Sequence, residues 1–325
     1  MQILAHTEVL RKIVPRGTIT QGELVLSVQR VRKAIRDPGM AATWALCRMH
    51  PGHYRSRLLA LAAKSGIRRP GFVLSFDCDT DRDSAVVLSL HERLRGAGLH
   101  PLYAVAGEVL QSATDTYRSL ARDGAEFLNH GYRRHAAIDA GSGDRISTYF
   151  YDAARRGEWQ DDIRLGHSAV ADVAGRTPDG FRTPHFGSFD GWPELNQLWH
   201  LLAGMGYRYS SSTRPVFAAA YGPVYRTAGI AEFPVSGCLD RPAQILDSWG
   251  LIAGGGHDSA GILSQLDAYL ALMRQGLPLL LNMYLDPVDI AGRDDVIAAL
   301  GRFAPYEVAG GFTALVGAEP DRAAS

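Results

Sequence analysis

The sequence contains few cysteines and no surplus of charge of either sign. Its 325 residues include only three cysteines, Cys47, Cys78 and Cys238, and no Cys-x-x-Cys pair. This argues against a disulfide framework and against a zinc ribbon. Thirty-four basic residues balance 34 acidic ones, so the overall charge gives no reason to expect nucleic-acid binding.

Long apolar runs are also missing. No stretch approaches the ~20 residues that are needed to cross a bilayer, and the longest ones, such as Leu277 to Leu281, have the length of a strand. Residues Met1 to Arg16 lack the apolar segment and small-residue cleavage site of a signal peptide. We therefore expect a cytoplasmic protein.

The N-terminal 70 residues differ in character from the rest. Apolar residues recur at helical spacing from Gln21 to Ile35, and a second helical stretch, Met40 to Ala63, is interrupted at Pro51. Arginine and lysine are frequent here, which fits either a helical extension whose charges are solvated or a basic surface, residues 21–69, for peripheral membrane contact. We favour the solvated extension. The small, polar residues 319–325 are expected to form a flexible tail.

Residues 71–318 alternate between short apolar runs and amphipathic stretches, which predicts an α/β domain with a parallel sheet, open or closed into a barrel. The expected strands are 72–76, 102–106, 125–128, 180–182, 207–211 and 278–284, and the expected helices are 84–98, 114–124, 161–174, 194–205 and 260–275. In both architectures functional residues gather at the carboxyl ends of the strands.

Two aspartates leave the first of these strands. Asp77 and Asp79 are two residues apart, so in an extended chain their side chains point to the same side. Two clustered carboxylates suit a cation together with a general base. The alternative is an acidic cap on the following helix, a role that suits Asp81 or Asp83 better.

Two later strand ends also carry polar residues. His130 and His135 follow the third strand, and two neutral imidazoles with one carboxylate form a common catalytic zinc site. Arg182 ends the next strand, where it could hold a carboxylate by a two-point contact. Alone, Arg182 could simply be a solvated arginine in a turn.

These motifs together resemble a known family. Phe76-Asp77-Cys78-Asp79, Asn129-His130-Gly131-Tyr132 with a trailing histidine, and Arg182-Thr183-Pro184 resemble the first three motifs of the NodB-like polysaccharide deacetylases, carbohydrate esterase family 4. The resemblance covers about residues 70–290. The Asp-x-Asp form is similar to the branch that includes deformylases of lipid-linked sugars.

The resemblance implies a distorted (β/α)7 barrel, here with an N-terminal helical extension, and a divalent metal, usually zinc. It implies that Asp77 is the general base, that Asp79 and His130 are metal ligands, and that Arg182 orients Asp77. Asp247 and Trp249 match the family's fourth motif. The residues expected to contact the substrate are His185, Asp247, Trp249 and Tyr132.

The sequence departs from the family pattern at two points. The family places its two histidines four residues apart, whereas His135 lies five residues after His130. On a helix this shift would turn His135 away from the shared face unless the loop bulges. The family's last strand commonly ends in a histidine that acts as general acid. Here Asp286, with a pKa raised by burial, or His257 in a glycine-rich loop is the candidate.

The predicted activity is metal-dependent hydrolysis of an N-acetyl or N-formyl group from an amino sugar, carried by a nucleotide or a lipid. Asp79, His130 and His135 would hold the metal, and Asp77 would take the proton of the attacking water. Two alternatives stay open. The chain could be a barrel without catalysis that binds sugar or serves as a scaffold, or an amidohydrolase of a small non-sugar amide.

Overall fold

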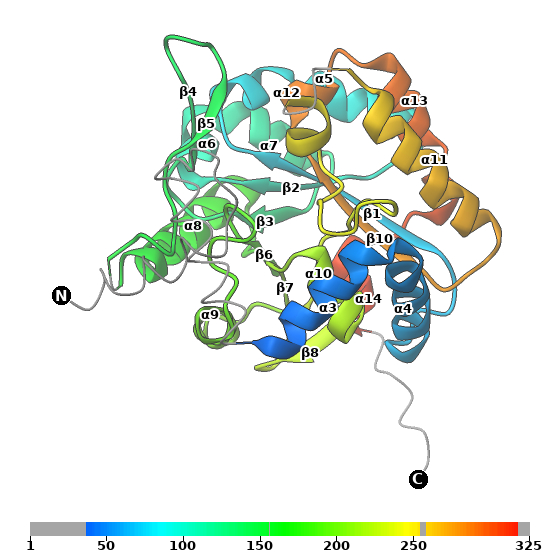
Figure 1. The fold of residues 1–325 in the computed structure, drawn as a ribbon. Helices are drawn as coiled ribbons and strands as arrows, with labels where there is room; N and C mark the ends of the chain where they lie inside the picture. The colour runs from blue at the N-terminus through cyan, green and yellow to red at the C-terminus, as the bar shows by residue number, and fades with distance from the viewer. Residues whose placement is uncertain (1–36, 156, 254–257, 318–325) are drawn as a thin grey trace. The chain divides into compact units, whose positions relative to one another are not determined.

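The computed structural model describes residues 37–155, 157–253 and 258–317 (Figure 1). The chain separates into two compact units, residues 1–41 and 42–325, and the sheet belongs to the second. The helix predicted over residues 21–35, the loop that contains His257 and the tail 319–325 lie outside the described residues.

Seven parallel strands form the central sheet of the described chain. In spatial order they are β10 (Leu280–Leu285), β1 (Gly71–Cys78), β2 (Leu102–Val105), β3 (Phe127–Asn129), β6 (Gly180–Arg182), β7 (Tyr209–Ser211) and β9 (Ile230–Glu232). The short strand β8 (Tyr225–Thr227) pairs with β9 in the antiparallel direction. Every residue of β1 and β10 is buried, as expected for parallel strands that are covered on both faces.

Hydrogen bonds from a side chain link the two ends of this sheet. The Asn282 amide nitrogen of β10 donates to the Phe233 carbonyl at 3.0 Å and to the Pro234 carbonyl at 3.1 Å, just beyond β9. The Ser236 backbone N–H donates to the Asn282 carbonyl at 2.9 Å. Pro234 has no N–H and cannot continue a backbone ladder. The side-chain amide of Asn282 provides hydrogen bonds between the two segments at this point instead. The fold is an α/β fold with a parallel sheet, as predicted, and its seventh strand meets the first without a regular ladder.

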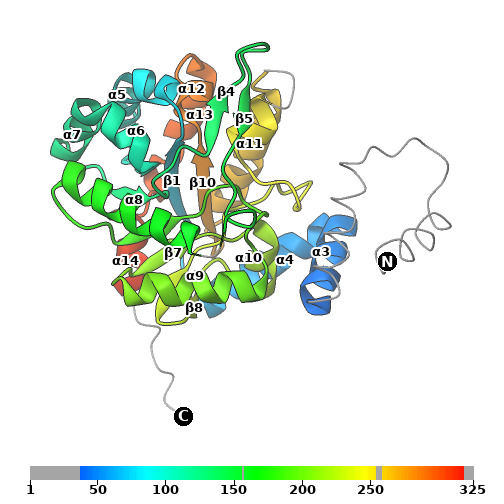
Figure 2. The ribbon, with the colours of Figure 1, turned by 90° about the vertical axis from the view of Figure 1, so that its left-hand side faces the viewer.

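Helices alternate with the strands and surround the sheet (Figure 2). The longer ones are α5 (Asp81–Gly96), α7 (Thr114–Arg122), α8 (Glu158–Ala174), α9 (Trp192–Gly204) and α11 (Ala260–Arg274), which confirms the predicted helices within a few residues. The shorter ones are α6 (Gly107–Ser112), α10 (Pro215–Tyr221), α12 (Pro287–Ile290), α13 (Asp294–Gly301), α14 (Gly311–Gly317) and the turns Trp249–Ala253 and Ala304–Tyr306.

The turn from β1 into α5 fixes where the first two aspartates lie. Asp83 accepts hydrogen bonds from the Thr80 backbone N–H at 3.0 Å and from the Thr80 hydroxyl at 2.7 Å. This reciprocal cap begins α5 at Asp81. Asp83 therefore has the capping role that was predicted for it or for Asp81, and Asp77 and Asp79 are left at the strand end.

In the described part of the chain, two helices precede the sheet. They are α3 (Pro38–Met49) and α4 (Pro51–Lys64), which confirms the predicted interruption at Pro51. Tyr54 and Leu58 of α4 are buried against the alanines of α10, and Arg57 donates to the Ala219 carbonyl at 2.6 Å. The division at residue 70 stays a prediction, although α4 and the sheet belong to the same compact unit. None of the described helices is long and apolar enough to cross a membrane.

The structure also contains a β-hairpin that the sequence did not predict. Its strands are β4 (Ala136–Ile138) and β5 (Arg145–Ser147), which pair in the antiparallel direction. Each strand has only three residues, too few to give a readable alternation of apolar and polar positions. The hairpin follows the predicted histidines directly, so it forms part of the site.

Candidate active site

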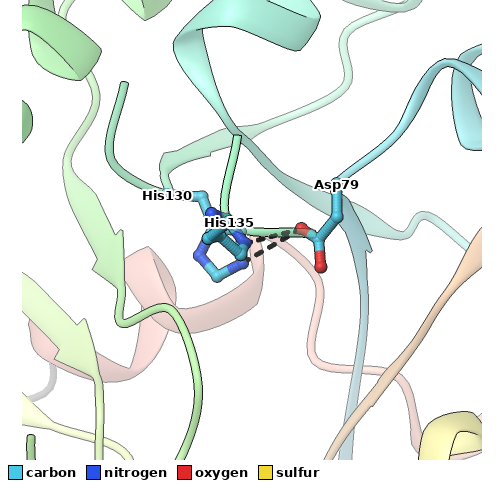
Figure 3. A group of neighbouring side chains, drawn as sticks. All are labelled: Asp79, His130 and His135. Atoms are coloured by element: carbon cyan, nitrogen blue, oxygen red, sulfur yellow. Dashed lines mark hydrogen bonds and ion pairs between the residues drawn. The ribbon is translucent and has the colours of Figure 1, made fainter. Parts of the chain in front are cut away.

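Three of the predicted residues converge beyond the carboxyl ends of the parallel strands β1 and β3, which are separated in the sheet by β2. Asp79 follows β1, His130 follows β3 and His135 precedes β4. The Nε2 atom of His135 lies 2.8 Å from Oδ1 of Asp79, and Nε2 of His130 lies 3.4 Å from the same oxygen. Figure 3 shows both imidazoles directed at this carboxylate. The three ligand atoms lie within 4.8 Å of one another, as expected of groups that could share one metal ion.

A hydrogen bond on the side of the ring away from Asp79 fixes the orientation of His130. Its Nδ1 atom lies 2.8 Å from the Arg182 carbonyl oxygen. A carbonyl oxygen only accepts hydrogen bonds, so Nδ1 carries a proton, and Nε2 is the ring nitrogen that faces Asp79 and that a metal ion could use. Metal-binding histidines commonly donate their other N–H in this way. The buried set of one carboxylate and two imidazoles therefore fits a divalent metal such as zinc.

The five-residue spacing of the histidines is accommodated because residues 130–135 form an irregular loop rather than a helix. Gly131 adopts a positive φ of 78° within this loop, a conformation that favours glycine. The loop bulges, and the ring centroids of His130 and His135 lie 4.4 Å apart. The helical argument against His135 therefore does not apply to this segment.

Asp79 and His135 shift each other's pKa values toward the charged forms. Burial raises the pKa of the Asp79 carboxyl, but the charges and hydrogen bonds of His135 and His130 outweigh it and hold that pKa well below its usual value. Burial alone would lower the pKa of His135, but the charge and hydrogen bond of Asp79 outweigh burial, and the pKa of His135 is raised. Asp79 is therefore ionised, as a metal ligand must be.

Asp77 lies beside this group and is held by an arginine. Arg182 donates to Oδ1 of Asp77 at 3.2 Å and to the Ser75 hydroxyl at 2.9 Å. Arg182 and Ser75 are fully buried. Burial raises the pKa of Asp77, and the Arg182 and His130 charges oppose this rise. The structure thus brings Arg182 to the position from which it could orient Asp77.

A cavity of about 290 Å³ opens over Asp77 and the three candidate ligands. The aromatic residues Phe150, Phe186, Trp249 and Tyr284 form much of its wall, and Asp247 and Asp286 add polar groups. Pockets that bind small molecules typically combine apolar walls with a few placed polar groups.

Asp286 lines the cavity and shares an arginine with a second acid. The Ser248 hydroxyl donates to Asp286 at 3.0 Å. Arg145 of β5 lies 3.3 Å from Asp286 but 2.6 Å from Asp289. Burial raises the pKa of Asp286 well above its usual value; Arg145 opposes the rise and Asp289 adds to it. Because burial and the Asp289 charge outweigh the opposing charge of Arg145, Asp286 can retain a proton.

The structure also locates the residues that were predicted to contact substrate. His185, Asp247 and Trp249 line the cavity, whereas Tyr132 is not among the lining residues and donates its hydroxyl hydrogen to Gln111 at 2.9 Å. The prediction for Tyr132 is therefore unsupported by its position, because its ring packs against the hydrophobic core. His257 lies outside the described residues.

His185 has an unusual backbone and a neutral ring. Its φ is 52°, uncommon for a residue other than glycine and often found at functional sites. The ring stacks on Phe150 at 4.3 Å between centroids. Burial, followed by the nearby His135 charge, lowers the pKa of His185 to about 4.

Sequence reasoning missed several residues of this site, among them Arg145, Tyr284 and Ser75. Arg145 lies in the unpredicted hairpin, and its guanidinium packs over the Trp249 ring at 4.8 Å. Tyr284 donates to Asp247 at 2.7 Å, and Ser75 binds Arg182. Ser75 and Tyr284 could have been found from strand alternation, since each lies two residues before a predicted site residue, Asp77 or Asp286. No local signal marks Arg145.

Comparisons with known proteins give a structural likeness. No protein-family model matches the sequence, and neither does any curated protein. A solved structure from Mycobacterium smegmatis, assigned as a polysaccharide deacetylase, matches with a TM-score of 0.56 at 21% identity and covers 77% of this chain and 90% of its own.

Two further solved structures resemble the chain less closely. A protein from Pseudomonas aeruginosa, also assigned as a polysaccharide deacetylase, has a TM-score of 0.49, 15% identity and coverage of 76% and 88%. The PuuE allantoinase has a TM-score of 0.49, 13% identity and coverage of 73% and 82%. These matches do not distinguish the Asp-x-Asp branch. The match to the Mycobacterium smegmatis structure shows that the chain has the fold of a solved protein assigned as a polysaccharide deacetylase, the family that its motifs resemble.

Proposed function

We propose that this protein is a metal-dependent amide hydrolase that removes an N-acetyl or N-formyl group from an amino sugar. One observation carries the proposal: Asp79, His130 and His135 converge beside Asp77, which Arg182 holds, at the floor of one cavity. A ligand set next to a positioned carboxylate is the minimum that hydrolysis of an amide requires.

Asp79, His130 and His135 would hold the metal. One carboxylate and two imidazoles leave an open coordination position, which is typical of catalytic zinc. Zinc bound there would supply an activated water and would polarise the acyl carbonyl.

Asp77 is the proposed general base. Its carboxylate lies 3.7 Å from Nε2 of His130, so it borders the place where an attacking water must sit. The hydrogen bond from Arg182 fixes the carboxylate in one orientation. Asp77 takes one proton from the water, whose oxygen forms a bond to the acyl carbon.

Asp286 is the proposed general acid. As the bond between the acyl carbon and the nitrogen breaks, the nitrogen needs a proton to leave as a neutral amine. Asp286 lines the same cavity, and the rise of its pKa by burial and by Asp289 favours the protonated form. The products are a carboxylic acid, which ionises in solution, and a neutral amine; loss of the proton from Asp77 to solvent and uptake of one by Asp286 restore the site. His257 was the other candidate for the general acid from the sequence, and this role stays a prediction.

The substrate is best tested with small compounds. Purified protein with added zinc is expected to release acetate or formate from an N-acylated amino sugar, and the released acid is measured directly. The arms are nucleotide-linked and lipid-linked N-acetyl and N-formyl sugars, with allantoin and simple acylated amines as non-sugar amides.

Each outcome has a distinct meaning. Release from non-sugar amides alone would favour the amidohydrolase alternative. Binding of a sugar without release of acid, in protein that contains zinc, would favour the alternative of a sugar-binding or scaffold protein. The nucleotide or lipid carrier, the cytoplasmic location and the membrane contact through residues 21–69 stay predictions.

A further inference from the structure

The two candidate histidine ligands lie on one irregular loop, and this loop has an anchor outside the ligand set. Between His130 and His135 the chain has neither helical nor strand geometry. Backbone N–H groups that are not paired within a helix or strand need other hydrogen-bond partners. Those partners then help to fix the position of one histidine relative to the other. The question is which residue provides them.

Asp162 of α8, which is 2% exposed, is the partner of two of these N–H groups, whereas the Arg134 N–H donates to Glu108 at 2.7 Å. Its Oδ1 accepts from the Arg133 backbone N–H at 2.9 Å, and its Oδ2 accepts from the Tyr132 backbone N–H at 3.1 Å. The Tyr151 hydroxyl donates to Oδ2 at 2.8 Å. One carboxylate therefore binds two consecutive backbone groups that lie midway between the histidines, by hydrogen bonds to a charged acceptor.

Gly131 shows that this contact is built into the loop. A Cβ at Gly131 would lie 2.5 Å from Oδ2 of Asp162 and 2.6 Å from the Tyr151 hydroxyl, closer than carbon and oxygen can approach. Its φ of 78° adds a second requirement for glycine. The positive φ of Gly131 thus turns the chain so that the Asp162 carboxylate reaches the N–H groups of Tyr132 and Arg133.

Helix α8 holds the other side of the loop as well. The Asn129 side chain accepts from the Gly131 N–H at 2.9 Å and donates to the Ile163 carbonyl at 2.8 Å. A Cβ at Gly166 of α8 would lie 2.5 Å from the Gly131 carbonyl oxygen, so helix and loop are in close contact. The loop is fastened to two successive residues of α8, Asp162 and Ile163.

We propose that Asp162 is a positioning residue for the metal centre: it fixes His135 relative to His130 across their five-residue spacing and thereby determines zinc affinity. The inference rests on the proposed function, because it needs the metal site. Outer residues that orient metal ligands typically contribute about 10–100-fold to metal affinity. Asp162 acts through the loop backbone rather than through an imidazole N–H.

The test is the affinity of the full-length protein for Zn²⁺ alone, measured by competition with a chromogenic chelator. Asp162→Asn keeps one acceptor oxygen but places an amide NH₂ against a backbone N–H, so it loses a loop contact. We expect its zinc affinity to fall about 10-fold or more, and that of Asp162→Ala to fall further, within the range for such outer residues. Tyr151→Phe leaves both backbone contacts in place and should cause a smaller loss.

Glu232→Gln is the matched control. Glu232 is also a fully buried carboxylate that accepts from a backbone N–H, that of Ser212 at 2.7 Å, but it contacts neither the loop nor a ligand. Thermal unfolding without metal is recorded for every variant. The control is expected to lose stability and to keep the zinc affinity of the wild type.

The outcomes separate the two claims. If the wild type binds zinc and folded Asp162→Asn binds it equally well, Asp162 has only a structural role and the inference is wrong, while the proposed function stands. If the wild type itself binds no zinc, both fail. If Asp162→Ala does not fold, Asp162→Asn and Tyr151→Phe still decide between these outcomes.

Discussion

At the scale of single residues, the two aspartates that leave β1 have different surroundings and so different roles. Asp79 contacts both histidines, whereas Asp77 contacts Arg182 and, at 3.7 Å, only His130. The pKa of Asp79 is lowered well below its usual value, and that of Asp77 is raised by burial. A permanently ionised ligand and a carboxylate that accepts a proton are the two functions that these environments favour.

Asp77→Asn should separate catalysis from metal binding. Asparagine keeps the size of the side chain but cannot take a proton, so kcat is expected to fall about 10²–10⁴-fold, the usual contribution of a general base. Because the three candidate ligands are untouched, zinc content should stay that of the wild type. Activity assays and metal analysis of the same sample check this prediction, and a variant with normal turnover would remove Asp77 from the mechanism.

The pH profile tests the role of Asp286. An acid must be protonated to act, so activity should fall as the pH rises through the pKa of Asp286. Burial raises this pKa most, and the Asp289, Asp79 and Asp83 charges raise it further, while Arg145 lowers it. Asp289→Asn removes one of the negative charges that raise the pKa of Asp286, and Arg145, which lowers that pKa, then faces Asp286 alone. The basic limb of the kcat profile is therefore expected to move to lower pH.

Asp294→Asn is the control for this shift. Asp294 is an exposed acid whose ion pair is with Arg93, away from Asp286, and its loss should leave the profile unchanged. A basic limb that does not move in Asp289→Asn would exclude Asp286 as the group that titrates there.

At the scale of elements, the site depends on a short hairpin whose arginine reaches across the cavity wall. Arg145 of β5 contacts acids of the β10–α12 region, 141 and 144 positions away in sequence. Its side chain is only 7% exposed. The β4–β5 hairpin is therefore linked to the strand end that carries the proposed acid.

Removal of this link should destabilise the protein. Arg145→Ala leaves the largely buried carboxylate of Asp289 without this cation, and breaking a buried ion pair from one side costs about 3–5 kcal/mol. Arg164→Ala is the matched control, because its pair with Asp161 is exposed and such pairs contribute about 0–1 kcal/mol. Urea unfolding of both variants gives the two free energies, and equal losses would contradict a buried link.

The elements also show how far the sequence leads. Strand β1 and helices α5, α8 and α11 could be predicted because they are long enough to show their apolar period. Asp77, Asp79 and His130 followed from their places at strand ends. The three-residue strands of the hairpin show no such period, so Arg145 was missed. Nor could the role of Asp162 be predicted, since its hydrogen bonds go to backbone groups 29 and 30 positions away.

At the scale of the whole molecule, the Asn282 side chain contributes hydrogen bonds that join the two ends of the sheet. The Asn282 amide binds the Phe233 and Pro234 carbonyls, and Asn282 is 1% exposed. This contact joins β10, next to the first catalytic strand, to the segment after β9. The carboxyl ends of the strands, where the site residues gather, are held around one cavity as a result.

Asn282→Ala should therefore weaken the whole domain. The two carbonyls would lose a buried donor, and each unsatisfied buried group costs about 1–3 kcal/mol. The free energy of unfolding in urea is expected to fall by about this amount or more. Gln275→Ala removes an amide that binds only the Ala271 carbonyl within its own helix end, and serves as the control with little change. A loss no larger than that of the control would show that Asn282 does not join the sheet ends.

The central claim is that Asp79, His130 and His135 bind a catalytic metal. Zinc content and amide hydrolysis, measured together on wild type and Asp79→Ala, test it most directly. We predict about one zinc per wild-type chain, loss of activity on chelation with recovery on adding zinc, and neither zinc nor activity in Asp79→Ala. Undiminished turnover by metal-free wild type or by Asp79→Ala would contradict the claim.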